Sequence, residues 1–101
     1  MNLTEYATYD GLGLAELVNG RKVTTRELRQ LFLAAIEKVN PEINAVIETY
    51  SECAQTFDEK TASGGAFTGV PFLMKDLGAS VRGKLQEFGS RLMVGHVAEN
   101  D

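Results

Sequence analysis

Apolar residues recur at helical spacing near the start of the chain, and they predict a short first helix. Asp10 is a suitable N-cap, because its carboxylate can accept a hydrogen bond from a free backbone N–H of the first turn. Leu14, Leu17 and Val18 follow at the spacing of one helical face, and Gly20 supplies a C-terminal stop.

A second, longer helix is predicted from Thr24. Thr24 and Glu27 have the spacing of a capping box, in which each side chain bonds to the other residue's backbone N–H. Asn40-Pro41 is expected to end this helix, since proline has no N–H to continue the ladder. The apolar face comprises six residues: Leu28, Leu31, Phe32, Ala35, Ile36 and Val39.

The pattern changes after Pro41 to one that predicts strands. The β-branched and aromatic stretch 45–50 reads as a strand, and a helix with a thin apolar stripe is expected from Ser51 to about Ser63. The continuous apolar run 70–74 is typical of a strand buried on both faces. A short helix over 90–94 is also expected, in a glycine-rich region with little other pattern.

The predicted order of helix, helix, strand, helix and strand indicates an α/β fold with parallel strands joined by a crossover helix. Two parallel strands do not form a stable sheet, because a parallel pair normally has further strands beside it and both faces covered. We therefore expect the chain to be an incomplete part of a larger α/β sheet.

Composition narrows the functional class. The chain has 101 residues, a mass of 11.0 kDa and a net charge of −4, and its basic residues are not clustered, so binding to nucleic acid by charge is not expected. The apolar stretches are too short to span a bilayer, and the first ten residues lack a signal-peptide pattern. One cysteine and one histidine cannot form an internal disulfide or a zinc site alone. A cytoplasmic chain without a structural metal is expected.

Three candidate sites have plain structural alternatives. Gly78 to Lys84 follows the glycine and lysine spacing of a phosphate-binding loop, but Leu85 stands where a hydroxyl should bind magnesium, so a surface loop is favoured. His96 has no acid or nucleophile placed near it and is expected in solvent. Cys53 is expected to be a small buried hydrophobic residue.

Lys75 ends the apolar run and is followed by Asp76. If its ammonium group were buried, desolvation would lower its pKa and make the neutral amine available as a base. If it emerged into water, it would be a polar terminator paired with Asp76. The pattern alone favours the second alternative, although the carboxyl ends of strands are where α/β folds bind ligands.

The segment Gly69-Val-Pro-Phe-Leu-Met-Lys-Asp-Leu77 closely resembles the part of the amidase signature family that carries its catalytic lysine. Three other segments agree in order: Gly13 to Val18, Asn40 to Val46 and Gly89 to Leu92. The residue pattern around the lysine is most similar to the branch with aminohexanoate cyclic-dimer hydrolases. Leu85 to Phe88 departs from the small residues and threonine that the family often has before its Gly-Ser, which leaves the substrate class open.

The resemblance implies hydrolysis of carboxylic amides without a cofactor or metal, by a serine, a second serine in a cis peptide bond and a lysine. Lys75 matches that lysine, which accepts a proton through the second serine and so activates the nucleophile. Neither serine of the family's glycine-rich signature has a counterpart here. The four serines considered as substitutes are rejected for lack of glycine-rich surroundings: Ser51, Ser63, Ser80 and Ser90.

We accordingly expect residues 1–101 to be the N-terminal fragment of a single amidase domain, inactive alone, with leading helices over 1–40 and the start of the α/β core over 41–101. Its leading helices are candidates for contact with a second copy or another partner through four leucines: Leu14, Leu17, Leu31 and Leu33. The alternative is a non-catalytic interaction module that self-associates or binds a full-length amidase through an unpaired sheet edge.

Overall fold

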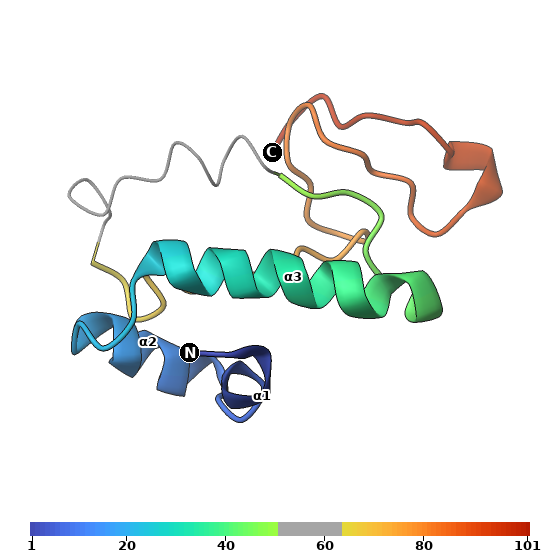
Figure 1. Cartoon of the computed structure of the whole chain (residues 1–101). Helices are drawn as coiled ribbons and strands as arrows, with labels where there is room; N and C mark the ends of the chain where they lie inside the picture. Colours follow the sequence, from blue (N-terminus) through green and yellow to red (C-terminus); the bar gives the residue numbers. More distant parts are fainter. Residues whose placement is uncertain (51–63) are drawn as a thin grey trace. The chain divides into compact units, whose positions relative to one another are not determined.

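The computed structural model describes residues 1–50 and 64–101, and it divides into two compact units, Met1–Pro71 and Phe72–Asp101. The first unit is helical, whereas the second is a looped segment with one short 3₁₀ helix (Figure 1). The elements in chain order are α1 (Leu3–Tyr6), α2 (Gly11–Asn19), α3 (Thr25–Ile43) and η1 (Arg91–Met93).

The first predicted helix is confirmed as α2, with both of its caps. The Asp10 carboxylate accepts the N–H of Gly13 at 2.8 Å, and the N–H of Gly20 donates to the Glu16 carbonyl at 2.8 Å. The left-handed backbone that ends the turn falls on Arg21, with φ 54°, rather than on the glycine. A short connection then reverses the chain, so α2 and α3 run in opposite directions (Figure 1).

The predicted start of α3 is confirmed, but the predicted end is wrong. The Thr24 hydroxyl accepts the Glu27 N–H at 3.1 Å, and the Glu27 carboxylate accepts the Thr24 N–H at 2.7 Å. The helix passes through Pro41 and closes at Asn44, whose N–H donates to the Asn40 carbonyl at 2.7 Å. A proline this close to the C-terminus removes only one ladder bond, and the next turn still forms.

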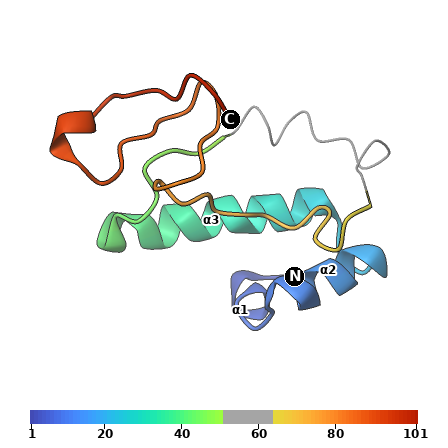
Figure 2. The same cartoon turned by 180° about the vertical axis from the view of Figure 1, so that it is seen from behind.

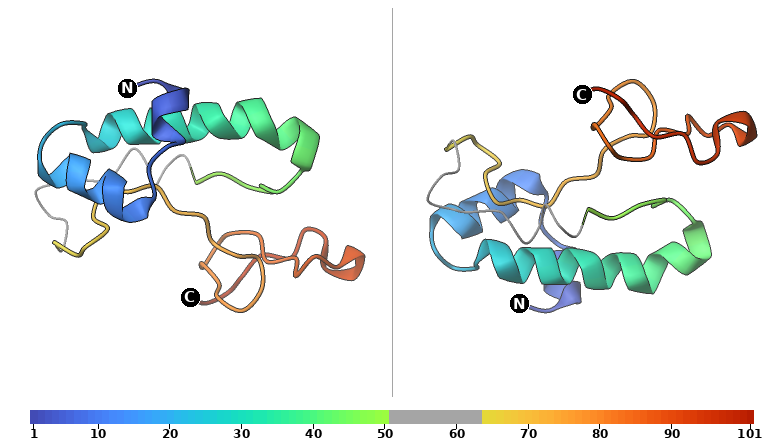
Figure 3. Two further views of the ribbon diagram at one scale, coloured as in Figure 1. Left: turned by 90° about the horizontal axis from the view of Figure 1, so that it is seen from below. Right: turned by 90° about the horizontal axis from the view of Figure 1, so that it is seen from above.

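The sequence pattern missed α1, although the signal was present. The Asn2 side chain accepts the Glu5 N–H and the Glu5 carboxylate accepts the Asn2 N–H, each at 2.9 Å, which is the same capping box that begins α3. This single turn crosses and contacts α3, as Figure 3 shows.

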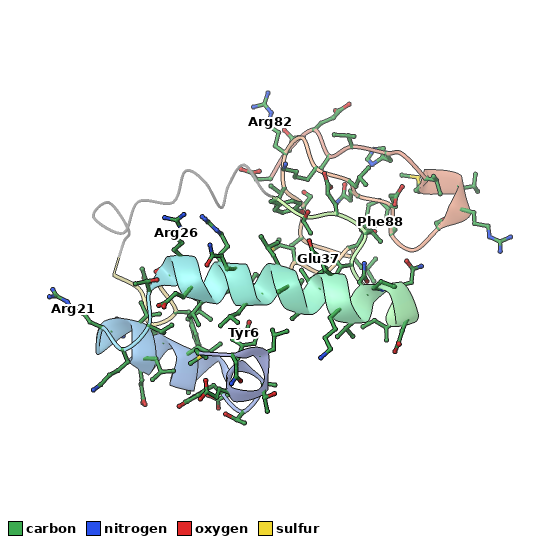
Figure 4. All side chains as sticks on the ribbon, viewed as in Figure 1. Tyr6, Arg21, Arg26, Glu37, Arg82 and Phe88 are labelled. Carbon is green, nitrogen blue, oxygen red and sulfur yellow. The ribbon has the colours of Figure 1, made fainter. Side chains whose placement is uncertain are left out.

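The core of the first unit is formed by Leu14, Val23 and Leu28, of which Leu28 is fully buried. Four half-buried side chains pack against this cluster: Tyr6, Leu17, Val18 and Val70. Figure 4 labels Tyr6 on α1 and shows Arg21 and Arg26 extending away from the helices. The rest of the predicted apolar face of α3 is only half-buried or exposed, and Val39 is 43% exposed.

The predicted strands do not form in the described part of the chain, so the α/β architecture expected from the sequence is not present there. Residues 45–50 and 70–74 are irregular, and the described ladder contacts reduce to one antiparallel bridge between Leu85 and Val97. A β-strand satisfies its backbone groups only through a neighbouring strand, and among the described residues neither segment has one. The helix predicted from Ser51 to Ser63 lies outside the described residues.

The second unit runs out to η1 and returns, as Figures 1 and 2 show from two sides. Three backbone hydrogen bonds join its outgoing and returning arms. Gly83 N–H donates to the Ala98 carbonyl at 2.8 Å, Ala98 N–H to the Lys84 carbonyl at 2.9 Å, and Gln86 N–H to the His96 carbonyl at 2.9 Å. The predicted helix over 90–94 is the 3₁₀ turn η1, with Ser90 as its N-cap.

Candidate functional site

Lys75 lies at the start of the second unit, and its side chain is exposed. Of the two sequence alternatives, the structure therefore has the lysine emerging into water. The expected pairing with Asp76 does not occur in the described part of the chain. Instead the half-buried Asp76 carboxylate accepts the Glu87 N–H, at 3.0 Å to Oδ1 and 3.2 Å to Oδ2.

Glu87 continues this chain of contacts. Its own carboxylate accepts the Gly95 N–H at 2.6 Å, and its carbonyl accepts the Ser90 N–H at 2.9 Å. Phe88 and Gly89 follow with φ values of 55° and 67°, so the backbone turns sharply just after Glu87. Two carboxylates thus hold the loop that carries η1 and connect it with the segment that carries Lys75.

His96 is exposed, as predicted, and belongs to the frame of this unit. Its Nδ1 lies 3.1 Å from the Gln86 carbonyl, and its ring centroid is 6.4 Å from that of Phe88, which Figure 4 labels. Because its Nδ1 and ring are occupied in joining the two arms of the hairpin, the histidine has a structural contact in place of a catalytic one.

The phosphate-loop alternative is wrong on geometry. A phosphate-binding loop connects a strand to the N-terminus of a helix, where free N–H groups point at the anion. Residues 78–84 are followed by the bridge at Leu85 and by no helix, and the Gly83 N–H is bonded to Ala98. The segment is the turn of a hairpin.

Neither described serine is a nucleophile in waiting. The Ser80 hydroxyl donates to the Asn100 carbonyl at 2.8 Å, and the Ser90 hydroxyl accepts the Leu92 N–H at 3.3 Å as a cap. Ser51, Ser63 and Cys53 lie outside the described residues. In residues 1–50 and 64–101 no three His, Cys, Asp or Glu side chains gather as metal ligands would.

The apolar residues around Lys75 are open to solvent. Phe72 is 77% exposed, Leu73 58% and Leu77 57%. The sequence predicted a run buried on both faces, and this prediction fails because burial requires sheet neighbours that the described residues do not provide. A lysine and an acid stand here within an exposed apolar strip.

The leucines proposed for a partner contact divide into two groups. Leu14 is 5% exposed and lies in the core with Leu17 packed on it, so these two are occupied inside the unit and that part of the prediction is wrong. Leu31 and Leu33 are half-buried, and Leu31 lines a shallow hollow on α3 with Met1, Glu27 and Ala34.

Comparison with known proteins identifies the family. No protein-family model and no solved structure matches the chain. Lipoamidase of Enterococcus faecalis is 38% identical over 93% of the chain, and the 6-aminohexanoate-cyclic-dimer hydrolase of Paenarthrobacter ureafaciens is 36% identical over 91%. A glutamyl-tRNA(Gln) amidotransferase component of Methylobacillus flagellatus is 34% identical over 87%. The chain belongs to the amidase signature family.

This amidase signature chain spans 13% of the lipoamidase and 19% of each of the other two relatives. Since the match to lipoamidase takes in nearly all of the chain, it includes the Lys75 segment on which the family resemblance was based. Over residues 1–50 and 64–101, no helix has both the length and the apolar character needed to cross a membrane.

Proposed function

We propose that this chain supplies the lysine-bearing part of an enzyme that hydrolyses carboxylic amide bonds. The observation that carries the proposal is the Gly69–Leu77 segment, within a match to relatives whose names are lipoamidase and 6-aminohexanoate-cyclic-dimer hydrolase. In this proposal residues 1–101 are the N-terminal part of one amidase domain.

Lys75 is the base of the proposed reaction. Its neutral amine accepts a proton from a bridging serine, which in turn takes the proton of the nucleophilic serine as that serine attacks the amide carbonyl. The C–N bond then breaks, the departing amine takes up a proton, and water hydrolyses the acyl-enzyme to the acid. Both serines belong to parts of the domain outside residues 1–101.

The described geometry supports this assignment in two ways. Lys75 is exposed in the chain and makes no ion pair with Asp76, so its amine is available to a bridging serine. Its neighbours Phe72, Leu73 and Leu77 present apolar surface, and covering that surface with the remainder of a domain would desolvate the lysine and favour its neutral form.

The test is a chimera in which this chain replaces the matching region of the 6-aminohexanoate-cyclic-dimer hydrolase. We expect the chimera to hydrolyse its amide substrate, and Lys75→Ala to reduce kcat/KM by about 10³-fold or more, since a general base contributes about 10²–10⁴ and here also activates a nucleophile. Lys38→Ala, at an exposed lysine on α3, is the matched control and should keep the parent rate.

The interaction-module alternative makes the opposite prediction. A folded chimera that never hydrolyses the amide, or one that hydrolyses it equally well with Lys75→Ala, would remove the catalytic proposal and favour a non-catalytic module.

A further inference from the structure

The residue that follows Lys75 is bonded to a distant part of its unit. Asp76 Oδ1 accepts the backbone N–H of Glu87 at 3.0 Å and Oδ2 lies 3.2 Å from the same nitrogen, across eleven residues of chain. Both residues are half-buried, whereas Lys75 itself is exposed. Hydrogen bonds from a backbone N–H to an ionised carboxylate are about twice as strong as neutral ones.

This bond is well placed to restrain the lysine. Asp76 is joined to Lys75 by one peptide bond, so fixing the Asp76 side chain limits the backbone from which the Lys75 side chain extends. Residues 72–75 are irregular, and no ladder hydrogen bond within the described residues holds them. The carboxylate of Asp76 is therefore the fixed point nearest to Lys75 in this unit.

The other end of the bond is itself fixed. The Glu87 side chain accepts the Gly95 N–H at 2.6 Å, and the Gln86 N–H donates to the His96 carbonyl at 2.9 Å. The position that Asp76 binds is thus held from both sides by the returning arm of the hairpin. Asp76 attaches the lysine segment to a braced loop rather than to a free one.

We propose that Asp76 is a positioning residue for Lys75, and that its carboxylate sets the lysine backbone by binding the Glu87 N–H. The proposal rests on the proposed function for the role of Lys75, while the restraint itself is a property of this chain. It departs from the sequence expectation that Asp76 is the ion-pair partner of the lysine.

The direct test is ¹H–¹⁵N NMR on the 101-residue chain. In Asp76→Ala we expect the Glu87 amide to exchange with solvent at least about tenfold faster, since a bond to an ionised group contributes about 1.5–3 kcal/mol. The ¹H–¹⁵N heteronuclear NOE at the Lys75 amide should fall in the same variant. Asp76→Asn keeps one acceptor oxygen without the charge and should give intermediate values for both.

Asp101→Ala is the matched control, because the Asp101 carboxylate also accepts a backbone N–H of this unit, that of Arg82 at 2.9 Å. It should leave the Lys75 amide unchanged. An unchanged Glu87 or Lys75 amide in Asp76→Ala would overturn the proposal. Equal loosening of Lys75 by Asp101→Ala would also overturn it, because it would show general melting of the unit.

Kinetics in the hydrolase chimera separate this proposal from the proposed function. Asp76→Ala should lower kcat by about ten- to a hundredfold with KM nearly unchanged, because a displaced base weakens the transition state more than substrate binding. A kcat unchanged by Asp76→Ala would count against positioning. A chimera inactive even with Asp76 would reject the amidase assignment, while the NMR result on the restraint would stand.

Discussion

At the scale of single residues, Gly69 marks the place where the lysine motif meets the helices of the first unit. Its φ is 84°, and a Cβ built there would lie 2.5 Å from Thr25 Oγ1 and 3.4 Å from Val18 Cγ1. The same hydroxyl is buried without a hydrogen-bond partner among the described residues. The first glycine of the motif is therefore required by close approach as well as by backbone conformation.

Gly69→Ala should lower the free energy of unfolding by about 2–4 kcal/mol, from left-handed strain together with overpacking. Gly64→Ala is the matched control: Gly64 has φ 68° but open space around it, so only the strain of about 1–2 kcal/mol applies. Urea denaturation measures both, and adding Thr25→Ala should recover part of the Gly69→Ala loss. Equal losses at the two glycines would contradict the contact.

Glu27 gives the first unit a pH dependence. The backbone N–H of Thr24, and secondly its hydroxyl, hold the pKa of this carboxyl below its ordinary value of 4.5. A lowered pKa stabilises the folded state above the unfolded pKa, and that contribution is lost as pH falls through the folded value. Circular dichroism at 222 nm should show α3 weakening below about pH 4.5, and Glu27→Gln should flatten this limb. An unchanged acid limb in Glu27→Gln would contradict the assignment.

At the scale of elements, Asn40 secures the end of α3. Its side chain amide donates to the Val46 carbonyl and its Oδ1 accepts the Val46 N–H, each at 2.8 Å. Asn40→Ala should therefore destabilise the turn by about 1–3 kcal/mol, because the half-buried backbone groups of Val46 lose their partner.

Amide exchange at Val46 measures this loss directly. Pro41→Ala is the control at the neighbouring position, and it should stabilise α3 slightly, because the new N–H can join the helix ladder. If Asn40→Ala left Val46 protected, the two side-chain bonds would not hold the turn.

The helices could be predicted from the sequence because their signals are local. Asp10, Thr24 and Glu27 contact residues three positions away, and the structure has those caps where the pattern predicted them. The α1 capping box has the same spacing and could have been found in the same way. The passage of α3 through Pro41 could not, because the residue before a proline has only a bias against helix.

The strands could not be predicted correctly because they depend on neighbours far away in the chain. The runs 45–50 and 70–74 have strand composition, but among the described residues nothing pairs with either of them. The bond from Asp76 to Glu87 is equally non-local, and the sequence pattern instead suggested the nearest charge, Lys75, as its partner.

At the scale of the whole molecule, the exposed strip around Lys75 distinguishes this chain alone from the same chain within an amidase domain. Phe72 is 77% exposed, so Phe72→Ser should change the stability of the 101-residue chain by less than about 0.5 kcal/mol. In the hydrolase chimera, where we expect the strip to be covered, the same substitution should cost about 3–5 kcal/mol.

Thermal or urea unfolding of both proteins measures this contrast. Leu92→Ser serves as the control at a residue that is 92% exposed in the chain. Equal, small effects of Phe72→Ser in the two proteins would contradict the expectation that a larger fold covers the lysine segment.

The central claim, that Lys75 activates a serine by accepting its proton, is tested most directly by the rate at which a fluorophosphonate labels the nucleophilic serine of the chimera. Labelling requires the activated hydroxyl and not the amide substrate, so it reports the base itself. We predict that Lys75→Ala slows labelling by at least about 10²-fold, while Lys38→Ala leaves the rate unchanged. Labelling of folded Lys75→Ala at the parent rate would contradict the account.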